Sequence, residues 1–117
     1  MPSMITNEWG SIYIDDRVVA NIACSSAMES YGIVGLAAQN TKDGLYELLG
    51  LENMTRGVCV HCIDAAHVEI ELSVIMEYGV RIAVVAENMI DTIKYNVETL
   101  TGLTVDAVHI IVRDIRV

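Results

Sequence analysis

One stretch of the chain, residues 67–76, limits the possible folds more than any other because its side chains alternate with a period of two. Every second position is apolar: Val68, Ile70, Leu72, Val74 and Met76. The positions between them are mostly polar: His67, Glu69, Glu71, Ser73 and Ile75. This alternation predicts a strand in a sheet that has one buried face and one open face.

Two amphipathic segments predict the helices that cover the buried face. The first follows Asp15 or Asp16, either of which is a suitable N-cap, and is expected to end by Gly32. Its apolar stripe recurs at spacings of three and four: Val18, Val19, Ile22, Ala23, Ser26 and Ala27. The second segment, residues 80–100, is longer, and Gly102 supplies its C-terminal stop. Both helices need an apolar surface to lie on, and the alternating strand supplies one.

Shorter segments complete the predicted order of elements. Strand patterns occupy residues 10–14, 31–38, 57–63 and 103–117, and residues 40–53 indicate a short helix. The sequence therefore predicts an α+β fold, a two-layer sandwich in which two long amphipathic helices pack on one face of a mixed β-sheet. The predicted order is β-α-β-(short α)-β-β-α-β. Because no linker or repeat divides the sequence, residues 1–117 are predicted to form a single domain.

Composition indicates where such a protein works. Sixteen acidic and seven basic residues give a formal net charge of −9, so the protein repels nucleic-acid phosphates and anionic lipid headgroups. The three cysteines are too few for a secreted disulfide framework, and no apolar run reaches the ~18 residues of a membrane span. We therefore expect a cytoplasmic protein with no nucleic-acid binding and no direct membrane insertion.

The supply of large apolar residues predicts the make-up of the core. The chain has no Phe and one Trp. We expect the core to consist of Ile, Val, Leu, Ala and Met, supplemented by a few of the five Tyr.

The candidate metal ligands are Cys59, His61 and Cys62, with His67 nearby, because thiolate and imidazole groups together bind zinc. In a strand, Cys59 and His61 project to one face and Cys62 to the other, and no second pair follows at structural-zinc spacing. We therefore expect ordinary strand residues, with no metal and no other cofactor. The sequence also lacks a convergent nucleophile, base and orienting carboxylate, which predicts a protein without enzymatic activity.

Four motifs follow one another along nearly the whole chain. They are Gly10-Ser11-Ile12-Tyr13-Ile14, Tyr31-Gly32-Ile33-Val34-Gly35, Glu77-Tyr78-Gly79, and Leu100-Thr101-Gly102-Leu103 followed by Val105 and Val108. In this order and spacing they resemble the alkaline shock protein family of Gram-positive bacteria, a family of envelope-stress and general-stress proteins. The absence of long charged extensions is similar to the short housekeeping branch of that family.

The resemblance implies a non-enzymatic, cytoplasmic and self-associating protein. Some members of the family are recruited to the membrane by a separate anchor protein, and others are linked to fatty-acid and acetyl-CoA metabolism. No catalytic residues are defined for the family. Its shared glycines are expected to meet the backbone requirements of turns: Gly10, Gly32, Gly35, Gly79 and Gly102.

Two functions follow from these observations. The first is a homo-oligomeric interaction or scaffold protein that binds a membrane-anchoring or lipid-metabolism protein and reaches the membrane only indirectly. Its contact surface is then an exposed sheet edge or a partner face made of Glu69, Glu71 and Ser73. The alternative is a regulatory domain that holds an acyl or lipid metabolite between helices and sheet, lined by Met28, Met76 and Met89.

Overall fold

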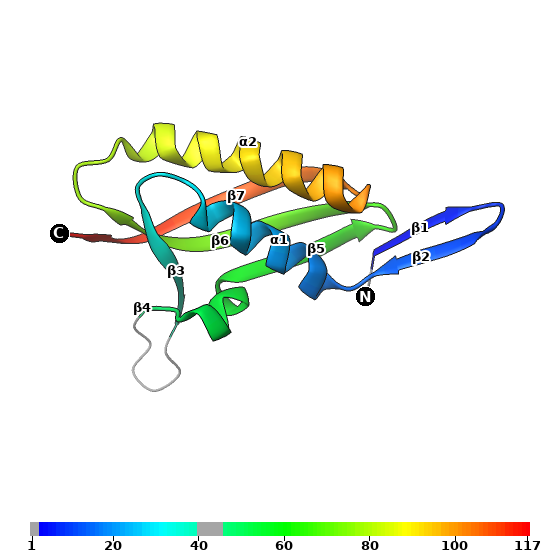
Figure 1. The fold of residues 1–117 in the computed structure, drawn as a ribbon, viewed down its shortest axis with the longest axis horizontal. Helices are drawn as coiled ribbons and strands as arrows, with labels where there is room; N and C mark the ends of the chain where they lie inside the picture. Colours follow the sequence, from blue (N-terminus) through cyan, green and yellow to red (C-terminus); the bar gives the residue numbers. More distant parts are fainter. Residues whose placement is uncertain (1–2, 40–45) are drawn as a thin grey trace.

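The computed structural model describes residues 3–39 and 46–117, coloured from blue to red in Figure 1. The first elements are β1 (Ser3–Asn7), β2 (Gly10–Ile14), α1 (Asp16–Met28), β3 (Ile33–Gln39) and β4 (Tyr46–Leu48). A 3-10 helix, η1 (Leu51–Gly57), leads to β5 (Val58–Asp64), β6 (His67–Glu77), α2 (Ile82–Thr101) and β7 (Thr104–Arg116).

Strand β6 organises the main sheet because three other strands pair with it. On one side, β5 pairs with its N-terminal half and β3 with its C-terminal end, both antiparallel, and β4 pairs with β3. On the other side β7 runs parallel to β6 along its whole length. Parallel neighbours need a long crossover connection, which α2 supplies. The sheet is therefore mixed, with Ile70 of β6 opposite Val60 of β5 and Val108 of β7.

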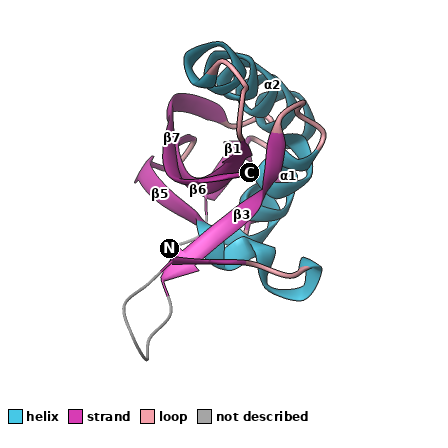
Figure 2. Ribbon diagram, turned by 90° about the vertical axis from the view of Figure 1, so that its left-hand side faces the viewer, coloured by secondary structure: helices cyan, strands magenta, loops and turns pink. Residues whose placement is uncertain are grey.

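The core lies between this sheet and the two α-helices, which cover the same face of the sheet (Figure 2). β6 contributes every second side chain from Val68 to Met76, and each of these is fully buried. They pack against the apolar stripes of the helices: Val19, Ala20, Ala23, Cys24 and Ala27 of α1, and Val85, Met89, Ile93 and Val97 of α2. Full burial of one such Val, Leu or Ile side chain stabilises the fold by roughly 1.5–3 kcal/mol.

The predicted layout and order of elements are wrong. Strand is the dominant secondary structure: residues 3–39 and 46–117 contain seven strands and two α-helices. Only α2 is long, with 20 residues, whereas α1 has 13. In addition, β1 and β2 form a separate two-stranded sheet. The molecule is α+β with a mixed sheet, but it is not the predicted sandwich of two long helices on one sheet.

Short strands with little apolar pattern account for this difference. β1 and β2 are joined by two residues, Glu8 and Trp9, so a local turn sets their pairing in place of a long hydrophobic run. The short helix predicted over residues 40–53 falls partly on residues 40–45, which lie outside the described residues. Of the remainder, Tyr46–Leu48 is strand β4, and the 3-10 helix η1 starts at Leu51.

The β1–β2 hairpin projects from one end of the molecule, which measures 54 × 33 × 21 Å (Figure 1). The base of the hairpin is fixed: the backbone N–H of Met4 donates to the carbonyl of Ala65 over 2.6 Å, and Ile5 and Ile14 pack against the core. Residues 6–13 are all exposed. Half of the hairpin thus stands away from the rest of the chain.

The tyrosines do not supplement the core as the composition suggested. Each aromatic side chain whose burial the structure describes is exposed: Trp9, Tyr13, Tyr31, Tyr78 and Tyr95. The described core is built from aliphatic side chains together with Cys and Met.

Candidate functional site

The face of the sheet that the helices leave open carries the residues predicted as a partner face. Glu69, Glu71 and Ser73 of β6 are half-buried and alternate with its fully buried positions, so they point away from the core. β5 places His61 opposite Glu69, and β7 places His109 opposite Glu71. Acidic and imidazole side chains are therefore interleaved across three strands.

Two of these side chains have partners on β7. His109 Nε2 lies 2.9 Å from Glu69 Oε1, and Arg113 Nε donates to Ser73 Oγ over 3.2 Å. Both contacts are exposed to water, where such pairs contribute little to stability. Glu69 and Ser73 thus belong to cross-strand polar pairs on a hydrated surface.

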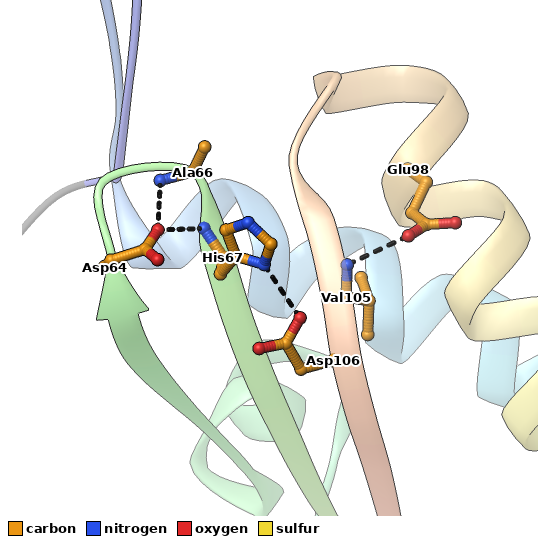
Figure 3. Close-up of polar contacts among 6 residues, drawn as sticks. All are labelled: Asp64, Ala66, His67, Glu98, Val105 and Asp106. Carbon is orange, nitrogen blue, oxygen red and sulfur yellow. Dashed lines mark hydrogen bonds and ion pairs between the residues drawn. The ribbon is translucent and has the colours of Figure 1, made fainter.

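A polar cluster lies at the end of the sheet, where β5 turns into β6 (Figure 3). Asp64 Oδ1 accepts hydrogen bonds from the backbone N–H groups of Ala66, at 3.0 Å, and His67, at 3.1 Å. His67 Nδ1 lies 2.8 Å from Asp106 Oδ1. The first carboxylate holds the turn in shape, and the second joins it to the start of β7.

The electrostatics of this cluster favour a charged imidazole. The hydrogen bond to the Asp106 carboxylate is the largest cause that raises the pKa of His67, and the negative charge of Asp64 adds to it. Nearby, Glu98 Oε2 accepts a hydrogen bond from the backbone N–H of Val105 over 3.0 Å, which ties α2 to β7 (Figure 3). These contacts connect three elements, and the cluster contains no nucleophilic side chain among its members.

The candidate metal ligands are divided between the two faces of β5. Cys59 and His61 are exposed on the open face. Cys62 points the other way, where its Sγ lies 3.4 Å from Ser3 Oγ and donates to Asp16 Oδ1 over 3.5 Å. Within the described part of the chain, no three His, Cys, Asp or Glu side chains are arranged to hold a metal ion.

The candidate metabolite-lining methionines are also separated. Met76 and Met89 are fully buried in the core, whereas Met28, at the end of α1, is 36% exposed. No common cavity lined by these three residues is seen in the described structure.

An open groove of about 640 Å³ lies where α1 ends and α2 begins. It is lined by residues from the end of α1, the turn after β6 and the first half of α2: Ser26, Glu29, Ser30, Tyr31, Glu77, Tyr78, Gly79, Val80, Arg81, Val84, Val85, Asn88 and Thr92. Its apolar part includes the exposed side chains of Tyr31, Tyr78 and Val84. This groove was not predicted from the sequence.

Two Tyr-Gly pairs were the available signal for the groove. Gly32 and Gly79 have φ angles of 87° and 96°, a left-handed conformation that favours glycine. Each glycine forms a tight turn directly after an exposed tyrosine, Tyr31 or Tyr78. Among the other predicted turn glycines, Gly102 has φ 79° at the end of α2, and a Cβ on Gly35 would lie 2.7 Å from Leu48 Cδ1.

No helix in residues 3–39 and 46–117 combines the length and the hydropathy that crossing a membrane requires.

Comparison with known proteins relates the chain to one family. The sequence model of the alkaline shock protein family, which is described as having a cell envelope-related function, matches residues 4–117. The chain is 40% identical over 114 residues to the uncharacterized protein YloU of Bacillus subtilis (strain 168), covering 97% of this chain and 94% of YloU. It is 36% identical over 118 residues to the uncharacterized protein Spy1614 of Streptococcus pyogenes serotype M6, covering 100% of this chain and 97% of Spy1614.

A solved structure shares the fold. The copper form of a MamM CTD superimposes with a TM-score of 0.52 over 86% of this chain and 98% of that chain. Its sequence identity to this chain is 8%, so the likeness concerns the fold alone.

Proposed function

Because the chain belongs to the alkaline shock protein family, whose function is related to the cell envelope, we propose that it is a non-enzymatic interaction protein that associates with copies of itself and with a second protein. The same match confirms the family resemblance that the sequence motifs indicated.

The placement of the aromatic side chains is the observation that carries this proposal. Trp9 is 89% exposed and Tyr31 is 85% exposed, although a buried aromatic residue removes roughly 150–250 Å² from water and dominates core energetics. Trp and Tyr are enriched at protein interfaces, where one end of the side chain is apolar and the other polar. A surface that holds the described aromatics outside the core is suited to binding other proteins.

The net charge supports an indirect route to the envelope. With a formal charge of −9, the protein is repelled by the anionic lipids of a membrane surface. We therefore place it in the cytoplasm and assign its attachment at the membrane to a partner protein.

Light scattering coupled to size-exclusion chromatography tests self-association, and affinity purification of the full chain from its native cell tests partner binding. We expect a mass that rises with concentration in the micromolar range and a stoichiometric co-purifying protein. A strict monomer without any stoichiometric partner would overturn the proposal.

A further inference from the structure

The outer half of the β1–β2 hairpin is an apolar arm that is incomplete on its own. Trp9 at its tip is 89% exposed, Tyr13 is 69% exposed and Ile12 is 57% exposed. A two-stranded hairpin that buries no face is only marginally stable in water. Contact with another surface stabilises such an arm by removing these side chains from water.

A surface of matching character lies at the opposite end of the molecule. The groove at the start of α2 is on the far side of the long axis from the hairpin (Figure 1). It presents Tyr31, Tyr78 and Val84, which are 85%, 74% and 47% exposed. Its volume of about 640 Å³ is within the range of pockets that enclose a ligand of several rings.

We propose that the hairpin tip of one copy docks into this groove of a second copy, with Trp9 against Tyr31, Tyr78 and Val84. The inference rests on the proposed self-association and assigns its contact surfaces. The two charged residues beside these apolar groups are complementary, because Glu8 adjoins Trp9 at the tip and Arg81 lines the groove. Among the described residues Arg81 forms no ion pair, so it is available to a carboxylate of another copy.

The geometry selects a second copy as the occupant. Tip and groove lie at opposite ends of a molecule 54 Å long, so the hairpin does not reach its own groove. The contact joins two different surfaces and is therefore heterologous, which leaves one free tip and one free groove after each addition. Because a hairpin tip buries less than the roughly 1,200 Å² of a standard interface, the contact is weak and the assembly grows with concentration.

The single Trp of the chain reports directly on this contact. As the concentration of the wild-type chain rises, we expect the Trp9 emission to shift to shorter wavelength because the indole leaves water. Val84→Glu places a charge in the groove without altering the hairpin, and we expect it to abolish the shift. An unchanged shift in this variant would overturn the proposal.

Mixing two variants tests whether the contact is heterologous. Trp9→Ala keeps the groove and Val84→Glu keeps the hairpin, so each alone is expected to associate at least about tenfold more weakly than wild type, as loss of an interface hot spot does. Mixed together, they retain one competent tip and one competent groove, and we expect pairs of one copy of each that grow no further. Tyr95→Ala, which removes an exposed aromatic outside the groove, is the matched control and is expected to associate as wild type does.

Charge exchange gives a second, independent test. Glu8→Arg is expected to weaken association, and Arg81→Glu in the same chain is expected to restore it. Circular dichroism confirms that each variant folds. If wild type associates while Trp9→Ala and Val84→Glu both associate equally well, the docking proposal is wrong and the proposed function stands. If wild type is a monomer at all concentrations, both are wrong.

Discussion

His67 is the residue whose charge is most directly controlled by a single neighbour, the Asp106 carboxylate at 2.8 Å. Because this hydrogen bond raises the pKa of His67 in the folded state, the charged pair stabilises the fold fully below the ordinary pKa of about 6.5. The contribution is lost as the pH rises through the raised folded value.

We expect a titration of the His67 ring protons by NMR to show this raised pKa. Asp106→Asn is expected to lower it because the amide carries no charge, whereas Glu71→Gln, on the open face of the sheet, is expected to leave it raised. A pKa of His67 that is insensitive to Asp106→Asn would contradict the assignment of Asp106 as its main cause.

The three thiols are expected to differ in reactivity because their surroundings differ. Burial raises the pKa of Cys24 to about 11, so little thiolate forms at neutral pH, and the side chain is also shielded by the core. Cys59 is exposed. Alkylation of the native protein, read out by peptide mass spectrometry, is expected to modify Cys59 first and Cys24 only on unfolding. Rapid modification of Cys24 in native Cys59→Ser protein would show that α1 opens readily.

At this scale, strand periodicity could place the candidate ligands on opposite faces but could not identify their contacts. A period of two is enough to separate Cys59 and His61 from Cys62. The contact of Cys62 with Ser3 joins residues that are 59 positions apart, and only the packing of β1 against β5 brings them together.

Two turn glycines distinguish backbone strain from steric contact at the level of elements. Gly79 has φ 96° and open space around an added Cβ, so Gly79→Ala is expected to cost only the left-handed conformation, about 1–2 kcal/mol. Gly32→Ala is expected to cost more, because its Cβ would also lie 2.8 Å from Val80 Cγ1.

Equilibrium urea unfolding of these variants measures the difference. Gly50→Ala is the control, since Gly50 has φ −74° and no heavy atom within 4 Å of an added Cβ. Its free energy of unfolding is expected to stay within about 0.5 kcal/mol of wild type. Equal losses for Gly50→Ala and Gly32→Ala would show that φ does not decide the effect.

Elements with strong periodicity could be predicted, and those fixed by a short local turn could not. β6 and α2 each combine a long pattern with one buried face, so burial energy selects them. β1 has five residues and β4 has three, too few for a pattern to stand out. Each forms because a neighbouring strand is already in place to accept its backbone hydrogen bonds.

The whole molecule carries its charge in a form that the sequence could predict. We expect no binding to phosphatidylglycerol vesicles in a flotation assay, because a net charge of −9 is repelled by an anionic surface. Neutral phosphatidylcholine vesicles serve as the comparison. Flotation that appears only with anionic lipid and disappears in high salt would contradict this expectation.

The position of the hairpin relative to the groove could not be predicted in the same way. Net charge is a sum over residues, but the separation of Trp9 from Tyr31 and Tyr78 depends on how the helices and the sheet are stacked. Sequence reasoning expected tyrosines in the core because large apolar groups are usually buried. Here the helix stripes already fill that space with Ala, Val, Ile and Met.

The parallel pairing of β6 with β7 has a consequence for how the chain reaches its native state. The longest ladder of the sheet joins a strand to a second strand that is synthesised only after the 20 residues of α2. Until β7 arrives, one edge of β6 is unpaired and lacks the cover of Val105 and Val108. Non-local pairing of this kind slows folding and leaves an aggregation-prone edge exposed in the meantime. The nascent chain therefore passes through a period in which its most apolar strand depends on its surroundings in the cell for protection.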